Sequence, residues 1–470
     1  MGAVLVPLLM WRLADRTNTF RWFVGAAFGS ILLLPWMTSF AVVGIAMLQW
    51  NGRVFDEEEY DWIVILWMVT FPWLVRCPIQ SYPSMRGIWT EGEWAVVVLL
   101  FWNICNETLH GLLNGNVVAQ VPLHNLVSLA GVMGTLMGCA AAAKMSPSLV
   151  LRAMLLVAAP ALSVEACLLW YHHHHHDQSV TSNESTDQGH TILKILPRSI
   201  RWLLQFLSEP DTTPARTAFV TPVSAGLPRS CFLLYWAAIL LMTALSMNYA
   251  SPSTMDKTKQ RSSSTTIARK FFHGVAILLF GPVTVFSPQL MSLGYAVALC
   301  ALMVAECLRP LLPVATQEFY LRYLDPSKDL PTRVILSHMA LIVGCALPLW
   351  IQETIDVAGG VESATPMSQR LLLSLWGAVI LGVGDSMGAI IGTKYGKTKW
   401  GRGRSVEGSA AVFLSTALCC ILLSRCNGNV NNDDAHQDWI PAVLFCTLLE
   451  AYTSQIDNLV LPLAGAVLLL

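Results

Sequence analysis

The residues of this chain that are best suited to chemistry are concentrated between Leu381 and Ser409. Asp385 lies there inside an otherwise apolar segment, where an ionisable residue is costly to bury and usually has a function. Glycine recurs at every fourth position from Gly384 to Gly396. This spacing predicts a helix with one stripe of small residues, where another helix or a ligand can approach the backbone closely.

A basic segment follows the glycines. Five cations lie within eleven residues, with no acid among them: Lys394, Lys397, Lys399, Arg402 and Arg404. The glycines between them allow backbone amides to surround an anion while the cations neutralise it, so the composition suits a polyphosphate. The spacing is not that of a Walker loop. Charge alone is equally consistent with a basic cytoplasmic loop between two membrane helices.

Two carboxylates flank the basic segment, Asp385 before it and Glu407 after it. Carboxylate oxygens are the ligands that Mg²⁺ prefers, and such an ion would bridge the protein and the phosphates. The combination favours phosphoryl transfer, with Asp385 and Glu407 as candidate metal ligands. Asp457 is a second acid between apolar runs, explained either by a function or by a structural polar network with Gln455 and Asn458.

The elements that must position these residues are membrane helices. The chain has 470 residues, of which 54% are hydrophobic and 13% are charged, and its mean hydropathy is +0.54. These values are too apolar for a soluble globular protein of this length. We therefore predict an all-α, polytopic integral membrane protein with about ten to thirteen transmembrane helices. The net charge of -1 excludes a general basic field for nucleic acid.

The first two parts of the chain differ sharply in composition. Residues 1–171 form apolar runs with few charges, which predicts a membrane scaffold. Residues 172–228 read as a polar linker that opens with the run His172–His176, expected to be an exposed low-complexity loop. Within this linker, Thr191 to Phe206 has an amphipathic pattern. Such a helix either lies on an anionic membrane surface or packs on the domain.

The third part, residues 229–470, is predicted to be a C-terminal membrane domain that carries a nucleotide-binding loop at 392–409. Its apolar runs lie near 229–249, 271–287, 289–308, 334–352, 371–392, 408–425, 439–453 and 456–470. The runs of the first part lie near 21–49, 61–77, 92–106, 117–143 and 148–171.

Two further charged patterns are weak by themselves. Arg269, Lys270 and His273 mark the entry to an apolar run, but basic residues at membrane boundaries are usual and a single histidine is more often structural than catalytic. Glu306 and Arg309 are three residues apart at one helix end, and they can simply pair with each other.

Taken in order, these motifs resemble the CTP-dependent polyprenol kinases, most closely the eukaryotic dolichol kinases. The resemblance covers Arg269 to Pro462, a little under half of the chain. It rests on Arg-Lys-x-x-His at 269–273, Glu306-x-x-Arg309, Gly-x-Gly-Asp385, the basic loop closing in Glu407-Gly-Ser409, and the segment from Glu450 to Pro462. One departure is that Arg404-Ser405 stands where the family commonly has Lys-Thr, which keeps the charge and the hydroxyl.

The resemblance implies a multi-pass enzyme of the endoplasmic reticulum membrane, with its nucleotide site on the cytosolic side. It would transfer the γ-phosphate of CTP to dolichol and yield dolichyl phosphate for protein glycosylation, with Mg²⁺ or another divalent cation as cofactor. The catalytic candidates are Asp385, Asp457 and His273, and the base is not assigned between the two acids. The nucleotide-binding candidates are Gly392, Lys394, Tyr395, Gly396, Lys397, Lys399, Gly401, Arg402, Gly403, Arg404, Ser405, Glu407 and Gly408. Other residues in the family motifs are Arg269, Lys270, Glu306, Arg309, Gln455 and Asn458.

Other functions also fit the sequence. A related CTP-using enzyme could act on another lipid, as a phytol kinase, a diacylglycerol kinase or a phosphatidate cytidylyltransferase. A transporter could instead use Asp385 and Asp457 to bind a coupling ion. A transporter is expected to show two related halves with corresponding broken helices, whereas the acids and glycines here crowd the C-terminal half.

Overall fold

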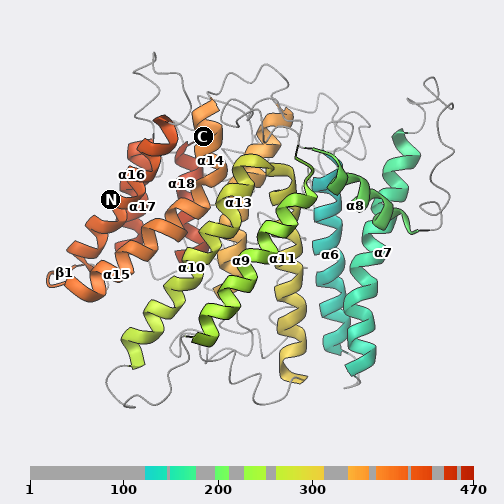
Figure 1. The fold of residues 1–470 in the computed structure, drawn as a ribbon, viewed down its shortest axis with the longest axis horizontal. Coiled ribbons are helices and arrows are strands. Elements are labelled where there is room, and N and C mark those ends of the chain that lie inside the picture. Colours follow the sequence, from blue (N-terminus) through green and yellow to red (C-terminus); the bar gives the residue numbers. More distant parts are fainter. Residues whose placement is uncertain are drawn as a thin grey trace, which may run out of the picture.

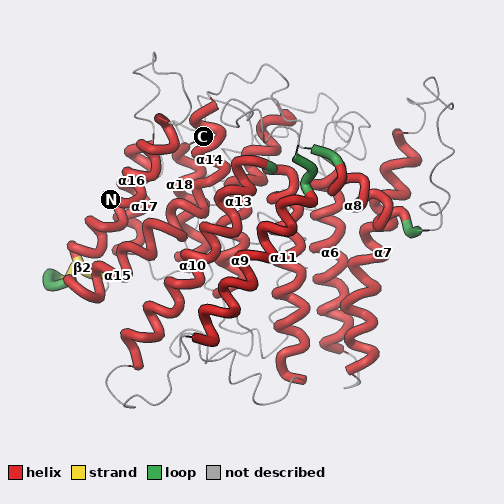
Figure 2. The backbone as a smooth tube through the Cα atoms, viewed as in Figure 1, coloured by secondary structure: helices red, strands yellow, loops and turns green. Residues whose placement is uncertain are grey.

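The computed structural model describes residues 122–144, 149–175, 196–210, 227–249, 261–311, 337–358, 367–400, 404–425, 439–452 and 457–469. These residues form a bundle of helices, most of which run side by side through its height (Figures 1 and 2). The helices before the glycine stripe are α6 Leu123–Lys144, α7 Leu149–His175, α8 Arg198–Ser208, α9 Ser230–Tyr249, α10 Arg261–Phe286, α11 Pro288–Leu308, the short 3₁₀ helix η4 Arg309–Leu311, and α13 Ser337–Ala358.

The remaining elements are α14 Met367–Gly377, the π-helix η5 Ala378–Gly384, α15 Asp385–Tyr395, β1 Lys399–Trp400, β2 Arg404–Ser405, α16 Val406–Arg425, α17 Trp439–Tyr452 and α18 Asp457–Leu469. The two strands pair antiparallel and form the only sheet within the described residues. The prediction of an all-α architecture is therefore confirmed, apart from this small hairpin.

Several of these helices are suited to a bilayer. Within the described residues, four helical segments are long and apolar enough to cross a membrane: Leu151–His173, Pro288–Leu308, Gln369–Tyr395 and Val406–Ser424. Five shorter apolar helices accompany them: Leu123–Cys139, Ser230–Ser246, Lys270–Phe286, His338–Glu353 and Trp439–Tyr452. A helix satisfies its own backbone hydrogen bonds, which is the condition for crossing hydrocarbon. The chain is thus a polytopic membrane protein.

The predicted spans agree with the structure wherever both can be compared. From residue 123 onward, each predicted run coincides with a described helix, and the runs near 21–49, 61–77 and 92–106 lie outside the described residues. One prediction is wrong at its edge, because α7 continues through the start of the histidine run as far as His175. Neither proline nor glycine interrupts the chain there, so the apolar helix extends into polar residues. The division of the chain at 171 and 229 stays a prediction.

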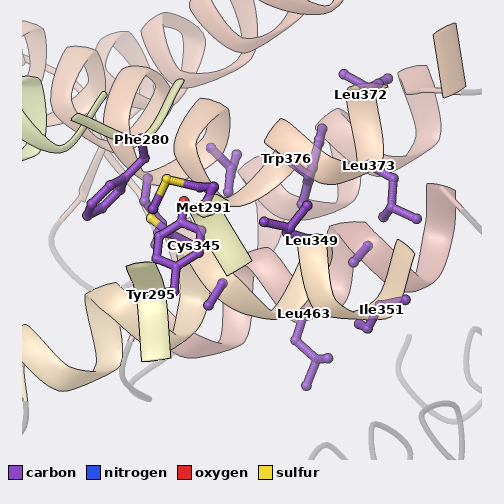
Figure 3. Close-up of a cluster of buried hydrophobic side chains, with 14 of the residues drawn as sticks. Phe280, Met291, Tyr295, Cys345, Leu349, Ile351, Leu372, Leu373, Trp376 and Leu463 are labelled. Carbon is purple, nitrogen blue, oxygen red and sulfur yellow. The ribbon is translucent and has the colours of Figure 1, made fainter. Parts of the chain in front are cut away.

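The buried core centres on the contact of α13, α14 and α18 and extends to Phe280 of α10 and Tyr295 of α11 (Figure 3). Trp376 of α14 is fully buried, with Leu349 of α13 and Leu463 of α18 in the same hydrophobic cluster. The indole of Trp376 lies against Gly465, where a side chain would overlap the ring. This close packing fixes α14, and it therefore fixes the start of η5, which carries the chain on to Asp385.

Candidate functional site

Asp385 stands at the junction between the π-helix η5 and α15. Its backbone N–H bonds to the carbonyl of Ile380, five residues earlier, as in a π-helix. The residue is buried, with 6% of its surface exposed. Such wide turns within a helix occur often at functional sites because they reorient the side chains that follow them. The local backbone thus presents Asp385 inside the bundle.

Helix α10 supplies the partners of Asp385. Lys270 Nζ donates a hydrogen bond to Asp385 Oδ2, and His273 Nε2 lies 3.6 Å from the same oxygen. Lys270 and His273 are three residues apart, so they lie on one face of the helix. Gly382 of η5 lies against Ile277 of α10, and this contact brings the two backbones together. Three residues of the predicted site, separated by 115 positions at most, are therefore in contact.

The glycine stripe packs against α16. Gly384 faces Val412 and Thr416, and Gly388 faces Val412 and the carbonyl of Gly408. A Cβ atom at Gly388 would overlap the side chain of Val412. The stripe thus serves helix packing, which was one of the two expectations for it. The close approach of α15 and α16 sets where the hairpin between them begins and ends.

The basic segment forms the hairpin of β1 and β2. Ser405 Oγ accepts a hydrogen bond from the N–H of Gly408 at 3.1 Å, a contact that caps the N-terminus of α16. The Glu407 carboxylate accepts the N–H of Thr398, at 3.2 Å to Oε1 and 3.3 Å to Oε2. Glu407 therefore closes the hairpin. Gly401, Arg402 and Gly403, at its tip, lie outside the described residues.

The cations of the hairpin divide into two groups. Lys394, in the last turn of α15, and Lys397 and Lys399 after it are exposed. Arg404 instead turns to α17, where its Nη1 lies 3.4 Å from Oε1 of Glu450. Glu450 is only 3% exposed, so its charge depends on Arg404 and its other neighbours for compensation.

An aromatic contact reinforces this attachment. The ring of Trp400 lies 5.8 Å from that of Tyr452, measured between centroids, and Trp400 Nε1 donates to Ser409 Oγ at 3.1 Å. The hairpin is therefore held on α17 and α16 together. The sequence prediction gave Glu450 no role; the signal that marks it is an acid within an apolar helix.

The two predicted metal ligands lie on neighbouring helices but make different contacts. Asp385 faces the cations of α10, whereas Glu407 binds the hairpin backbone. Within the described residues, no group of three or more histidine, cysteine or carboxylate side chains is placed to hold a metal ion. The nine described cysteines are free thiols. A metal site at Asp385 and Glu407 stays a prediction.

The structure describes some of the other family-motif residues in full and others only in part. Glu306 and Arg309 pair with each other at 2.8 Å, as their spacing allows. The carbonyl of Asn458 lies against Gly344, close to Leu381, so the start of α18 lies beside η5. For Asp457 and Arg269 the structure describes the backbone but not the side chain, and Gln455 lies outside the described residues.

Together, the fold and the site define a helical, polytopic membrane protein in which a buried carboxylate pairs with a partly buried lysine, and the helix that the carboxylate begins leads into a basic hairpin. Its known relatives are dolichol kinases. The chain is 28% identical over 290 residues to dolichol kinase of Homo sapiens, covering 59% of this chain and 50% of that protein. It is 28% identical over 268 residues to dolichol kinase EVAN of Arabidopsis thaliana, covering 55% and 43%.

A third relative is dolichol kinase sec59 of Schizosaccharomyces pombe, 30% identical over 209 residues, which cover 42% of this chain and 37% of that protein. The chain spans about half the length, or less, of the curated relatives that it matches. No family model and no solved structure matches it. The chain is thus a distant homologue of the dolichol kinases over roughly half of its length.

The buried pair between α10 and α15 can be tested by its stability. Lys270→Met leaves the Asp385 charge buried without its main partner, which costs about 3–5 kcal/mol. The double variant Lys270→Met, Asp385→Asn removes both charges and is expected to regain most of the lost stability. Thermal unfolding of the full chain in detergent measures the stability of the single and the double variant. An unchanged melting temperature for Lys270→Met would contradict the pairing.

The packing of the glycine stripe can be tested by adding a side chain. Gly388→Val forces α15 away from Val412, and overpacking of this kind costs about 1–3 kcal/mol. Gly281→Ala is the matched control, because a Cβ atom at Gly281 meets nothing within 4 Å. We expect a lowered melting temperature for Gly388→Val only. Equal melting temperatures for the two variants would contradict the packing.

Proposed function

We propose that this chain is a dolichol kinase that transfers the γ-phosphate of CTP to the terminal hydroxyl of dolichol. The observation that carries the proposal is the buried Asp385, which is paired with Lys270 and begins α15, the helix that leads into a hairpin rich in cations. Homology to dolichol kinases supports the same conclusion. The products are CDP and dolichyl phosphate, the lipid used in protein glycosylation.

The hairpin is the proposed site for the triphosphate. Lys394, Lys397 and Lys399 are exposed, and Arg404 pairs with Glu450. Phosphoryl transfer needs positioning and neutralisation of the phosphate oxygens more than covalent catalysis. Arg402 and the glycines of the hairpin tip complete the proposed cradle. A hairpin attached at both ends holds these cations in place before the nucleotide binds.

A carboxylate is proposed to orient and deprotonate the lipid hydroxyl. The hydroxyl oxygen bonds to the γ-phosphorus, the bond to the bridging oxygen of CDP breaks, and the proton passes to the carboxylate. Asp385 is held for this task by Lys270 and His273. Asp457 is the alternative base, because it begins α18, which packs beside η5.

A divalent cation, Mg²⁺ or another, is proposed to accompany the nucleotide. Asp385 and Glu407 supply carboxylate oxygens, which suit this ion, but both accept hydrogen bonds from the protein. Phosphate oxygens from CTP would therefore have to complete the ligand set. When bound, the ion would neutralise charge on the transferred phosphate.

The lipid substrate needs no aqueous cavity. A long isoprenoid can enter sideways from the bilayer between helices and bring its hydroxyl to the carboxylate. We place the protein in the endoplasmic reticulum membrane, with the hairpin on the cytosolic side, where CTP is available. The same reaction scheme fits phytol or diacylglycerol as acceptor, so the acceptor is part of the test.

The proposed activity is tested with the purified full chain, dolichol and γ-labelled CTP. We expect label in the extracted lipid with CTP, and Asp385→Asn is expected to reduce turnover by about 10²-fold or more. Glu353→Gln is the control, because it neutralises another buried carboxylate, in α13, whose partner is His124 of α6. Diacylglycerol and phytol are assayed in parallel.

If only diacylglycerol or phytol became labelled, that lipid and not dolichol would be the acceptor, and the proposed kinase reaction would still stand. Release of pyrophosphate from CTP, with no label in the lipid, would identify a cytidylyltransferase. No turnover with any acceptor by folded protein would leave ion transport, measured as flux into proteoliposomes, as the remaining explanation of Asp385 and Asp457.

The role of Glu450 is tested through the KM for CTP. Glu450→Gln removes the charge that orients Arg404, so we expect a higher KM for CTP with a smaller change in kcat. Tyr452→Phe is the matched control on the same helix, since it keeps the ring that contacts Trp400 and is expected to keep the KM. A KM that is unchanged in Glu450→Gln would show that Arg404 needs no partner.

A further inference from the structure

Helix α8 is a short amphipathic helix that packs on the bundle with one face. Phe206 is its buried residue, with 8% of its surface exposed. The ring of Trp202 stacks on that of Phe206, with centroids 5.2 Å apart. Phe206 in turn lies 6.1 Å from the ring of His124 in the first turn of α6. One side of α8 is thus committed to the protein.

Both ends of α8 are fixed by residues outside it, from α7 at its start and from the turn before α9 at its end. At its start, Oε1 of Glu165 in α7 accepts hydrogen bonds from the backbone N–H of Ser199 at 3.0 Å and from its hydroxyl at 2.8 Å. These contacts satisfy an N-terminal N–H that a helix cannot pair internally. The sequence analysis gave Glu165 no function, and this cap explains the acid within α7.

At the other end of α8, the side chain of Arg229 contacts both α8 and α11. It donates to the carbonyl of Phe206 at 2.8 Å and to Oε1 of Gln289 at 2.6 Å. Its guanidinium also lies 4.1 Å from the centre of the Phe206 ring. A helix of this length is marginal in isolation, so these contacts determine its position and orientation.

These contacts place α8 at one end of the bundle (Figure 1). His124 lies in the first turn of α6, Arg229 directly precedes α9, and Gln289 lies in the first turn of α11. Lys270 precedes Phe286, the last residue of α10, by 16 residues, or about 24 Å of helix. The Asp385 site and α8 therefore lie toward opposite ends of α10.

A second face of α8 is apolar and is partly exposed in the part of the chain that the structure describes. Ile200, Leu203 and Leu204 are 42%, 40% and 47% exposed. The third face is polar: Arg198, Gln205 and Ser208 are exposed, and Gln205 donates to Glu209 at 3.1 Å. Leu203 and Gln205 are two residues apart and so lie on nearly opposite sides of the helix.

We propose that α8 lies in the membrane interface at this end of the bundle. Ile200, Leu203 and Leu204 insert among the upper acyl chains. The exposed Arg198 and the half-buried Arg201, both on the polar face, bind the phosphates of phospholipid headgroups. Three observations favour a lipid occupant. The helix lies where several apolar helices begin, its apolar face adjoins a basic face, and arginine matches the charge and geometry of phosphate. The scaffold-side helices α6 and α7 would thereby be fixed in depth.

The test uses the full chain in phospholipid nanodiscs. A polarity-sensitive fluorescent amino acid replaces Leu203 in one variant, Leu204 in a second and Gln205 in a third, which avoids labelling the native cysteines. Each variant is exposed to a water-soluble quencher and, separately, to a lipid carrying a quencher near its headgroup. We expect blue-shifted emission at 203 and 204, with loss of emission to the lipid quencher only. At 205 we expect loss to the water-soluble quencher.

Two results would overturn the proposal. Quenching at 203 and 204 by the water-soluble reagent, as at 205, would place the apolar face in solvent. Protection of 203 and 204 from both quenchers would show that protein, such as a second copy of this chain, covers the face. Because three positions are read independently, misfolding of one variant leaves the test intact. The measurement does not depend on kinase activity, so it is independent of the proposed function.

Discussion

The arrangement of the site depends on keeping a carboxylate charged inside an apolar helix bundle. An isolated buried carboxylate is too costly to keep ionised, and a cation must be brought to it across the fold. Here Lys270 supplies that charge from α10, and His273 adds a second nitrogen from the same face. The pair joins two helices that are far apart in sequence. The position of Asp385 therefore depends on the packing of α10 against η5.

Glycine provides the second condition, which is close approach. The basic hairpin can cap α16 and reach α17 only if α15 and α16 lie almost in backbone contact, and Gly388 and Gly408 allow this. The hairpin is then closed by Ser405 and Glu407 and attached to α17 through Arg404. Charge and packing therefore act together. The glycine stripe sets the distance between α15 and α16, and the buried Glu450 holds Arg404 of the hairpin against α17.

The sequence predicted much of this arrangement because the signals were local. Apolar runs of membrane length gave the helices, and glycine spacing gave the stripe. The contact of Lys270 with Asp385 was not predictable from spacing alone, because it joins residues 115 positions apart. The extension of α7 into the histidine run was missed because the polar composition of that run resembles a loop. The run contains no proline or glycine, so nothing in it stops the helix. Glu450 opens the last family motif, but its contact with Arg404 was not predicted, and Glu165 was missed, because the partners of both acids come from other elements.

The two ends of the bundle face different tasks, and α10 connects them. Toward one end, Lys270 and His273 of α10 pair with Asp385. In the proposed reaction, a soluble triphosphate and a membrane lipid meet at this carboxylate. Toward the other end, α10 leads into α11, whose first turn binds Arg229 and so holds α8. A reaction between a nucleotide and a bilayer lipid requires the carboxylate to stay at a fixed depth. The proposed position of α8 in the interface anchors the bundle at the end opposite Asp385. The depth of Asp385 in the membrane is then set by the length of α10.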